Sequence, residues 1–289
     1  MHYEGMIIRP PSEANSILLQ VAVGCSHKKC TFCGTYLDER FRIIPEATVM
    51  ADIDFAAANC RRQDRLFLVG GDALILPQKK LMKILEEIER KLPWVKRVGI
   101  YGNTKALNMK TPEELEELRT HGLGIAYMGL ESGDNETLKA VNKGATAEKM
   151  IAMGTKARAA GIRLSVTVLL GLAGKSRSKI HAVQTGRVLT AIDPEYVGAL
   201  SLMLIPGTPL HTDFAAGRFQ LPDASEMLRE LRVMMAHTEL TGGLFHANHA
   251  SNYLPIRARL PEEKEKTLSL IDAAIEGRVS LKPEYLRAL

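Results

Sequence analysis

The chain has 289 residues, of which 46% are hydrophobic and 25% are charged, and its formal net charge is +5. A chain of this size and composition buries about three quarters of its unfolded surface, so we expect one large domain without a disulfide framework. The positive charges are spread along the sequence, which favours a solvated surface over a nucleic-acid-binding face. Residues 1–11 hold no apolar signal segment and no apolar run is long enough to span a bilayer, so we expect a cytoplasmic protein that binds no membrane.

Short apolar runs alternate with amphipathic stretches along the first two thirds of the chain. They predict strands at residues 16–23, 66–69, 97–101, 124–130, 163–170 and 196–204. Periodicity and capping residues predict a helix that opens at Thr111 and further helices at residues 46–59, 78–91, 146–160 and 176–191. This alternation is typical of an α/β fold with a mainly parallel sheet, in which ligands bind beyond the carboxyl ends of the strands.

The last part of the chain has a different pattern. Helices are predicted at residues 222–241 and 261–276, and a polar stretch, residues 244–255, lies between them. We expect three parts: an N-terminal extension at 1–15, a core at 16–210, and a short helical C-terminal extension at 211–289 that closes the substrate mouth. Within this polar stretch, His249, Asn252 and Tyr253 are candidates to contact the substrate. The alternative is that the stretch is a seventh strand followed by an Asn/Ser turn.

The most unusual stretch is residues 24–36, named here the cysteine loop, which follows the first predicted strand. It carries Cys25, Cys30 and Cys33, three of the four cysteines of the chain, within nine residues. Three thiolates on one loop can bind a metal centre, but a [4Fe–4S] cluster normally takes four. A loop with three cysteines therefore leaves one iron open to a small molecule.

Two other metal centres also fit a cysteine triplet. A structural zinc site needs a fourth ligand, which His27 inside the loop could provide, although most such sites pair two CxxC units. The spacing C-x4-C-x2-C also occurs in [2Fe–2S] ferredoxins, whose fourth cysteine comes later in the chain. Here that ligand would be Cys60, whose position at the end of a predicted helix is typical of a buried thiol. An electron-transfer protein and a zinc-stabilised binding module are therefore alternatives to an enzyme.

Other unusual turns follow the predicted strands. They are Gly70-Gly71-Asp72 after the second strand and Glu131-Ser132-Gly133 after the fourth, with Val141-Asn142-Lys143-Gly144 downstream. Together with an aromatic residue just before the last cysteine of the loop, these motifs occur in the order found in radical S-adenosylmethionine (SAM) enzymes. Over residues 16–210 the chain resembles this superfamily, in particular the branch of the oxygen-independent coproporphyrinogen oxidases and the methylthiotransferases. It departs in one feature, since most members have C-x3-C-x2-C and this loop has one more residue before Cys30.

The resemblance implies a partial (βα)6 barrel similar to a TIM barrel, with one [4Fe–4S] cluster held by Cys25, Cys30 and Cys33, and SAM chelated to the fourth iron. Phe32 would lie against the adenine. The other implied cofactor-binding residues are Gly70, Gly71, Asp72, Glu131, Ser132, Lys143 and Thr167. Asn103 follows the third predicted strand, and its position alone makes it a further cofactor-binding candidate.

Most of these residues are given a specific contact by the resemblance. Gly70 and Gly71 would let the backbone approach the SAM amino group, and Asp72 would accept a hydrogen bond from it. Glu131 would bind the ribose hydroxyls, and Lys143 would pair with the SAM carboxylate. Taken alone, the glycine pair is also typical of an ordinary strand-to-helix turn, and the lysine of a solvated charge.

The implied reaction is reductive. One electron from the cluster would split SAM, and the 5′-deoxyadenosyl radical so formed would take a hydrogen atom from a substrate, with His249 and Tyr253 as candidate catalytic residues. We expect reduced flavodoxin or ferredoxin as the electron donor. Because only Cys60 is left over, a second cluster is not expected. Sulfur insertion is therefore disfavoured, and a small-molecule substrate is favoured over a nucleic acid.

Overall fold

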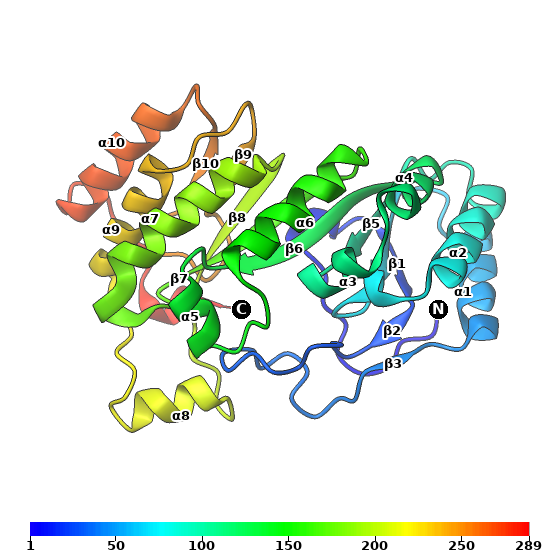
Figure 1. Ribbon diagram of the computed structural model, residues 1–289, viewed down its shortest axis with the longest axis horizontal. Helices are drawn as coiled ribbons and strands as arrows, with labels where there is room; N and C mark the ends of the chain where they lie inside the picture. Colours follow the sequence, from blue (N-terminus) through cyan, green and yellow to red (C-terminus); the bar gives the residue numbers. More distant parts are fainter. Residues whose placement is uncertain (289) are drawn as a thin grey trace. The chain divides into compact units, whose positions relative to one another are not determined.

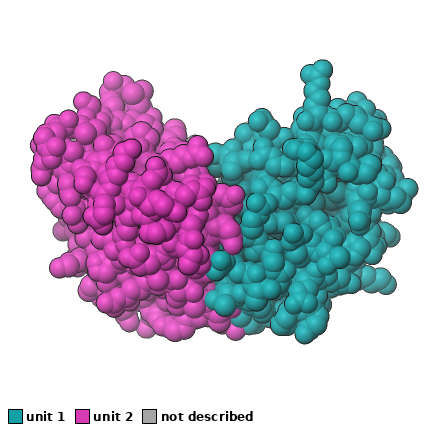
Figure 2. Space-filling model, turned by 90° about the horizontal axis from the view of Figure 1, so that it is seen from above, with its two compact units in different colours: residues 1–28, 35–128, 153–164 teal, residues 29–34, 129–152, 165–289 magenta. Residues whose placement is uncertain are grey.

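The computed structural model describes residues 1–288 and divides into two compact units (Figure 2). The first unit comprises residues 1–28, 35–128 and 153–164, and the second comprises residues 29–34, 129–152 and the chain from 165 onward. The last position of the expected C-terminal extension, residue 289, lies outside the described residues. Because the cysteine loop passes from the first unit into the second and back, each unit carries some of the predicted site residues.

The first unit is built on a parallel sheet (Figure 1). Its strands follow the order β1 (Ile17–Gln20), β4 (Arg65–Val69), β5 (Arg97–Tyr101) and β6 (Leu123–Glu131). Leu66, Leu68 and Ile100 have no exposed surface, as expected for parallel strands that are covered on both faces. The last three residues of β6, 129–131, belong to the second unit.

Helices cover this sheet, and all of them except α3 lie where the sequence predicts helices. They are α1 (Glu46–Asn59), α2 (Gln78–Lys91), α3 (Thr104–Met109), α4 (Pro112–Thr120) and, from residue 153, the rest of α6 (Ala147–Ala159). Helix α2 has the predicted bounds and buries its apolar stripe, including Leu81 and Ile88. Helix α4 begins with the predicted cap, in which Thr111 and Glu114 form a capping box.

The first predicted strand, residues 16–23, divides in two. The strand is interrupted at Val21, and β2 (Ala22–Val23) pairs antiparallel with β3 (Arg42–Ile43) in a separate small sheet. The expectation of one continuous strand was therefore wrong. The reason is that residues 22–23 pair with residues 42–43, which follow the cysteine loop, instead of continuing along β4. This β2–β3 pair closes the base of the loop.

The second unit carries a sheet with strands β7 (Arg163–Leu170), β8 (Tyr196–Ser201), β9 (Leu244–His246) and β10 (Arg257–Arg259). The pairs β7–β8 and β8–β9 are parallel, whereas β9–β10 is antiparallel. The helices of this unit are α5 (Asn135–Ala140), α7 (Gly174–Ile192), α8 (Pro209–Ala215), α9 (Ala224–Ala236) and α10 (Lys264–Ile275), with the start of α6. The extension after residue 210 therefore contains two strands as well as helices.

The predicted fold class is confirmed. The sheets are mainly parallel, strands alternate with helices, and no closed barrel forms within residues 1–288, so the architecture is an α/β partial barrel. Strand 196–204 was predicted too long, because it ends at Ser201, whose backbone N–H donates to the side chain of Ser251. Three short helices, α3, α5 and α8, were missed because six or seven residues are too few to show a helical repeat. None of the helices in residues 1–288 combines the length and apolar content needed to cross a membrane.

Candidate functional site

In the first unit, the turn after β4 packs directly against the first cysteine of the loop. The Gly71 backbone N–H donates to the Gly24 carbonyl at 2.9 Å. A Cβ atom on Gly71 would lie 2.6 Å from the ring of Tyr36 and 3.0 Å from the Cβ of Cys25, closer than side-chain atoms tolerate. Glycine is required here because the backbone comes so close. The structure thus brings the predicted glycine pair and Cys25 together.

Asp72 lies at the centre of a hydrogen-bonded cluster in the same unit. Its side chain accepts from the Ser26 hydroxyl, from the Asn103 backbone N–H at 3.1 Å and from the Asn103 side-chain amide at 2.7 Å. Asp72 is fully buried, and this burial raises the pKa of its carboxyl group, although the hydrogen bonds from Ser26 and Asn103 oppose the rise. This cluster of hydrogen bonds links the turns after β4 and β5 to the cysteine loop. Ser26 was not singled out from the sequence.

In the second unit, residues 29–34 of the cysteine loop are fixed by backbone hydrogen bonds. The Thr31 N–H donates to the Val141 carbonyl, and the Leu210 N–H donates to the Thr31 carbonyl, both at 3.0 Å. The Cys33 N–H bonds to the Cys30 carbonyl at 3.3 Å. Phe32 packs against an apolar cluster formed by Val141, Leu172, Leu202 and Leu210. The predicted adenine contact therefore lies on an apolar surface in this unit.

The structure pairs two of the predicted SAM ligands with each other. The ammonium group of Lys143 lies 3.0 Å from the Glu131 carboxylate, and only 14% and 13% of the two side chains are exposed, so Lys143 is not a solvated surface charge. Gly129 makes room for the pair, because a Cβ atom there would lie 2.3 Å from the carboxylate and 2.9 Å from the ammonium. Glu131 also has a φ of 62°, a left-handed conformation that is strained for a residue with a side chain.

The turn that contains Glu131 is held by a polar network that the sequence did not reveal. The Ser132 hydroxyl lies 2.7 Å from Nδ1 of His181, and the Gly133 N–H donates to the Thr185 hydroxyl at 2.8 Å. Ser132, His181 and Thr185 have no exposed surface. Helix α7, which carries His181 and Thr185, therefore fixes the turn after β6.

The network continues to helix α9. The other ring nitrogen of His181, Nε2, lies 3.4 Å from the carboxylate of Glu230, which is also buried. Glu230 accepts hydrogen bonds from the Gly171 N–H at 2.6 Å and from the Ser178 hydroxyl. One buried histidine–glutamate pair thus joins the turns after β6 and β7. Glu230 lies between Leu228 and Leu231 on the apolar stripe of a predicted helix. A charged residue in such a position is the signal that could have identified it.

An ion pair completes the turn after β6. Arg177 of α7 donates two hydrogen bonds, at 2.9 and 2.8 Å, to the carboxylate of Asp134. Burial of Asp134 would raise its pKa, but the hydrogen bonds from Arg177 and Thr137 outweigh this and hold the pKa at about 2. Asp134 is therefore ionised at neutral pH, and it also caps helix α5 through the Thr137 N–H.

Thr167 lies in the middle of β7, opposite Gly198 on β8. Side chains alternate along this strand, so Thr167 shares a face with Leu169, which packs against the apolar cluster that contacts Phe32. Thr167, one of the predicted cofactor-binding residues, therefore shares a strand face with a residue that packs against the same cluster as Phe32.

The polar stretch after β9 is anchored at the carboxyl end of β8. The Ser201 hydroxyl donates to the Asn252 side chain at 2.8 Å, and the Asn252 amide donates to the Ala199 carbonyl at 2.8 Å. Asn252 is almost completely buried, so its side chain is engaged in holding the stretch in place. The seventh strand considered from the sequence is present as β9, and the turn that follows it lies at the ligand-binding end of β8.

His249 and Tyr253 have different surroundings. Nδ1 of His249 accepts from the Ser251 N–H at 3.2 Å, which leaves the proton on Nε2; burial and the nearby Lys282 lower the pKa of His249, so the ring is neutral. The Tyr253 hydroxyl donates to Glu284 at 2.6 Å, and Arg287 lies 4.2 Å from the centre of its ring. Burial and Glu284 raise the pKa of Tyr253 to about 12.

The three cysteines of the loop are half-buried. No group of three or more His, Cys, Asp or Glu side chains in residues 1–288 is gathered closely enough to hold a metal ion, so the ligand set rests on the spacing of the cysteines along the chain. Thiolate is the donor that iron–sulfur clusters take, and both parts of the loop are fixed by their own unit. The chemistry of the donors therefore fits such a cluster. Cys60 lies elsewhere, at the end of α1, where its carbonyl accepts from the Trp94 indole at 3.2 Å.

Comparison with known proteins agrees with this chemistry. A family model described as the radical SAM superfamily matches residues 19–184. An uncharacterized protein of Methanocaldococcus jannaschii is 22% identical over 224 residues, which cover 73% of this chain and 68% of that protein.

Solved structures share the fold. The coproporphyrinogen III oxidase HemN from Escherichia coli, described as a radical SAM enzyme, has a TM-score of 0.57 at 20% identity, covering 76% of this chain and 51% of HemN. Methylornithine synthase (PylB) has a TM-score of 0.54 at 16% identity, covering 78% of this chain and 63% of PylB. The methyltransferase TsrM from Kitasatospora setae, solved with cobalamin and a [4Fe–4S] cluster bound, has a TM-score of 0.54 at 20% identity, covering 70% of this chain and 37% of TsrM. The chain thus spans between about a third and two thirds of these solved proteins. Since the family model covers more than half of the chain, the protein belongs to the radical SAM superfamily and is an enzyme that uses a [4Fe–4S] cluster and S-adenosylmethionine.

Proposed function

We propose that Cys25, Cys30 and Cys33 hold three irons of one [4Fe–4S] cluster and leave the fourth iron to SAM. When bound, the cluster and SAM supply a 5′-deoxyadenosyl radical that takes a hydrogen atom from the substrate. The observation that carries the proposal is the contact between the Gly71 backbone and Cys25. It brings the turn after β4, whose backbone the SAM amino group would contact, beside the first cysteine.

The residues around the first cysteine would bind and orient the amino-acid end of SAM. Gly70 and Gly71 let the turn after β4 pack closely against the start of the cysteine loop, and Asp72 offers a carboxylate that Ser26 and Asn103 hold in one orientation. Because its oxygens already accept three hydrogen bonds, Asp72 would act mainly by fixing the loop and by its charge. Asn103 would contribute through Asp72.

In the second unit, Glu131 and Lys143 would exchange their mutual contact for contacts with SAM. Glu131 would accept from the ribose hydroxyls, and Lys143 would pair with the SAM carboxylate. The left-handed backbone of Glu131 supports a binding role, because such strain persists mainly where the surrounding structure and function require it. Ser132 would hold the turn through His181, and Phe32 and Thr167 would contact the adenine and ribose.

The substrate would bind beside the polar stretch at the carboxyl end of β8. His249 is neutral and carries its proton on Nε2, so it can donate a hydrogen bond to a substrate oxygen. Tyr253 bonds to Glu284 and Arg287, so we propose that it positions the stretch and does not touch the substrate. The core at 16–210 would perform the chemistry, and the extension from residue 211 would close the substrate side over a small molecule.

The electron must come from outside the chain, and we propose reduced flavodoxin or ferredoxin as its source. The direct test is to reconstitute the protein with iron and sulfide without oxygen, to record its iron content and absorption, and to add SAM and dithionite. We expect a brown protein with about four irons per chain that forms 5′-deoxyadenosine. Replacing Cys60 with alanine is the matched control and should change neither result. A colourless zinc protein, or a two-iron spectrum indifferent to SAM, would overturn the proposal in favour of a binding module or an electron carrier.

A further inference from the structure

The sheet of the second unit has one buried face and one open face. Along β7, β8, β9 and β10, buried residues alternate without exception with residues that are at least partly exposed. Parallel strands are normally covered on both faces, and β7, β8 and β9 are parallel. An uncovered face on such strands is therefore a place where a ligand can bind.

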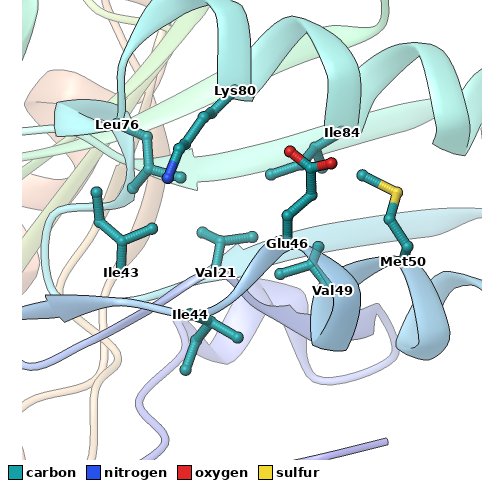
Figure 3. Close-up of a pocket in the computed structure, with 9 residues that line it drawn as sticks. All are labelled: Val21, Ile43, Ile44, Glu46, Val49, Met50, Leu76, Lys80 and Ile84. Atoms are coloured by element: carbon teal, nitrogen blue, oxygen red, sulfur yellow. The ribbon is translucent and has the colours of Figure 1, made fainter.

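In the first unit, by contrast, the space between α1, α2 and the β2–β3 pair is closed (Figure 3). Its lining includes Val21, Val49, Leu76 and Ile84, which are buried, and it leaves room for about one water molecule. This space takes no substrate, so the open sheet face of the second unit is the stronger candidate.

One row of residues crosses the open face from strand to strand. Thr167 of β7 pairs with Gly198 of β8. Gly198 in turn pairs with His246 of β9, which pairs with Arg257 of β10. Neighbouring strands lie about 4.8 Å apart, so the row extends over about 14 Å from the first strand to the last. This length suits a small molecule that lies across the strands.

The middle of the row is open, and its far end is positively charged. A Cβ atom on Gly198 would meet nothing closer than 3.9 Å, so there is space in front of this strand. Arg257 is exposed and forms no hydrogen bond or ion pair within residues 1–288. The open face of these four strands carries neither Asp nor Glu. The guanidinium group is therefore available to an anion.

His246 lies beside this arginine and has an unused ring nitrogen. Its Nε2 atom is buried and has no hydrogen-bond partner in the described part of the chain, and a buried polar atom without a partner is costly. Burial, together with Arg257, lowers the pKa of His246, so the ring is neutral at pH 7. A neutral imidazole can donate one hydrogen bond to an oxygen atom. The two side chains thus match a group with several negatively charged oxygens.

We propose that His246 and Arg257 bind an anionic group of the substrate, a carboxylate or a phosphate. The planar guanidinium holds two oxygens of this group, and His246 donates a hydrogen bond to one of them. The body of the substrate lies over Gly198, and its reacting hydrogen points toward Thr167. The inference rests on the proposed function, which puts Thr167 at the adenosyl group of SAM, where the radical forms.

The test uses phenylglyoxal, which modifies accessible arginine side chains, on the reconstituted protein. Peptide mass spectrometry follows the modification of Arg257 and, in the same sample, of Arg229, an exposed arginine on α9 that serves as the internal control. Acetate and inorganic phosphate are the probes, and chloride at the same ionic strength is the blank. Relative to chloride, at least one probe should slow the modification of Arg257 by about threefold or more and leave that of Arg229 unchanged.

Variants of the histidine test its part in the site. His246→Phe removes the hydrogen bond, so the probe concentration that gives half protection of Arg257 should rise about tenfold, as expected for a bond to a charged group. His246→Gln is the conservative variant. It keeps a donor and should stay within about threefold of the wild type. The melting temperatures of the three proteins check that each is folded.

The outcomes distinguish this proposal from the proposed function. Protection by acetate, by phosphate or by both supports the anion site and tells which group it accepts. Equal modification of Arg257 in probe and blank, equal slowing of Arg229, or wild-type protection in His246→Phe overturns it. The proposed function is tested separately, by 5′-deoxyadenosine formation with dithionite. If the wild type forms 5′-deoxyadenosine while Arg257 is not protected, the anion site fails and the function stands; if none forms, the function itself fails.

Discussion

The turns after β4 and β6 have the same place in the repeating fold but are held in opposite ways. The turn Gly70–Asp72, in the first unit, packs closely against the cysteine loop because Gly71 has no Cβ that would clash with Cys25. The buried carboxylate of Asp72 then links the neighbouring loops by hydrogen bonds. Glu131–Asp134, in the second unit, is held by side chains of helix α7, one of which, His181, contacts Glu230 of α9. The difference teaches that a turn can be fixed by close backbone packing or by a buried polar network, and that mutations should damage the two in different ways.

The strongest way to break the second turn is to remove the ring nitrogens of His181. The change His181→Phe removes the buried hydrogen-bond partner of the Ser132 hydroxyl, whereas Glu230 keeps its hydrogen bonds from Gly171 and Ser178, so the free energy of unfolding should fall by about 1–3 kcal/mol. Urea denaturation of the reconstituted protein measures this. His237→Phe, at the exposed end of α9, is the control and should change stability little. A loss below about 1 kcal/mol for His181→Phe would mean that the network does not hold the turn.

The corresponding change in the first turn is Gly71→Ala. The added Cβ would come within 2.6 Å of Tyr36 and 2.9 Å of the Gly24 carbonyl, and overpacking of this kind costs about 1–3 kcal/mol. Because the displaced neighbours include Cys25, we expect the iron content after reconstitution to fall too. Gly198→Ala on β8 is the matched control, since its Cβ would meet nothing closer than 3.9 Å. Full iron content and wild-type stability in Gly71→Ala would contradict the close packing.

A smaller effect on stability and a clear effect on binding are expected for the Glu131–Lys143 pair. Glu131→Gln removes a charged acceptor, so the affinity for SAM should fall about tenfold. The free energy of unfolding should fall by about 1 kcal/mol, because the glutamine amide oxygen still accepts a hydrogen bond from Lys143 and only the charge-assisted part of the bond is lost. Equilibrium binding of SAM to the reconstituted protein, together with urea denaturation, measures both. Unchanged affinity for SAM would remove Glu131 from the binding site.

The smallest net effect is expected for Asp72→Asn, because relief from burying a charge is offset by weaker bonding to Asn103. Its signature is the pH dependence. Burial raises the pKa of Asp72 above its ordinary value of 3.8, so the folded protein keeps the proton at a pH where the unfolded chain has lost it. The stability from this group is therefore complete below pH 3.8 and decreases as the pH rises through the folded pKa.

The measurement is the melting temperature of wild type and Asp72→Asn at several pH values between 4 and 8. The wild type should lose stability relative to the variant as the pH rises through the lower part of this range. A difference that stays constant with pH would show that the carboxyl group titrates alike in the folded and unfolded chains.

The sequence predicted the parts of the fold that depend on local patterns. The apolar stripe of α2, the capping box of α4 and the glycines after β4 are each signals within a few neighbouring residues. It could not predict contacts that only tertiary structure creates. Ser132 and His181 are 49 residues apart, and His181 and Glu230 meet across two helices.

The same distinction between local patterns and tertiary contacts applies to the candidate site. Residue types and order identified Glu131 and Lys143, but not that they pair with each other, because α5 lies between them in the chain. His249 and Tyr253 looked equivalent in sequence. The structure separates them, because Tyr253 bonds to Glu284 and Arg287 from the end of the chain, which no local pattern indicates.

The central claim is that the polypeptide leaves one iron of its cluster open, and electron paramagnetic resonance of the reduced protein with and without SAM tests it most directly. If three cysteines hold the cluster, SAM binds to the fourth iron, so adding it should change the spectrum of the reduced cluster in the wild type and in Cys60→Ala alike. A spectrum that SAM leaves unchanged, or a protein that assembles no four-iron cluster, would contradict the account.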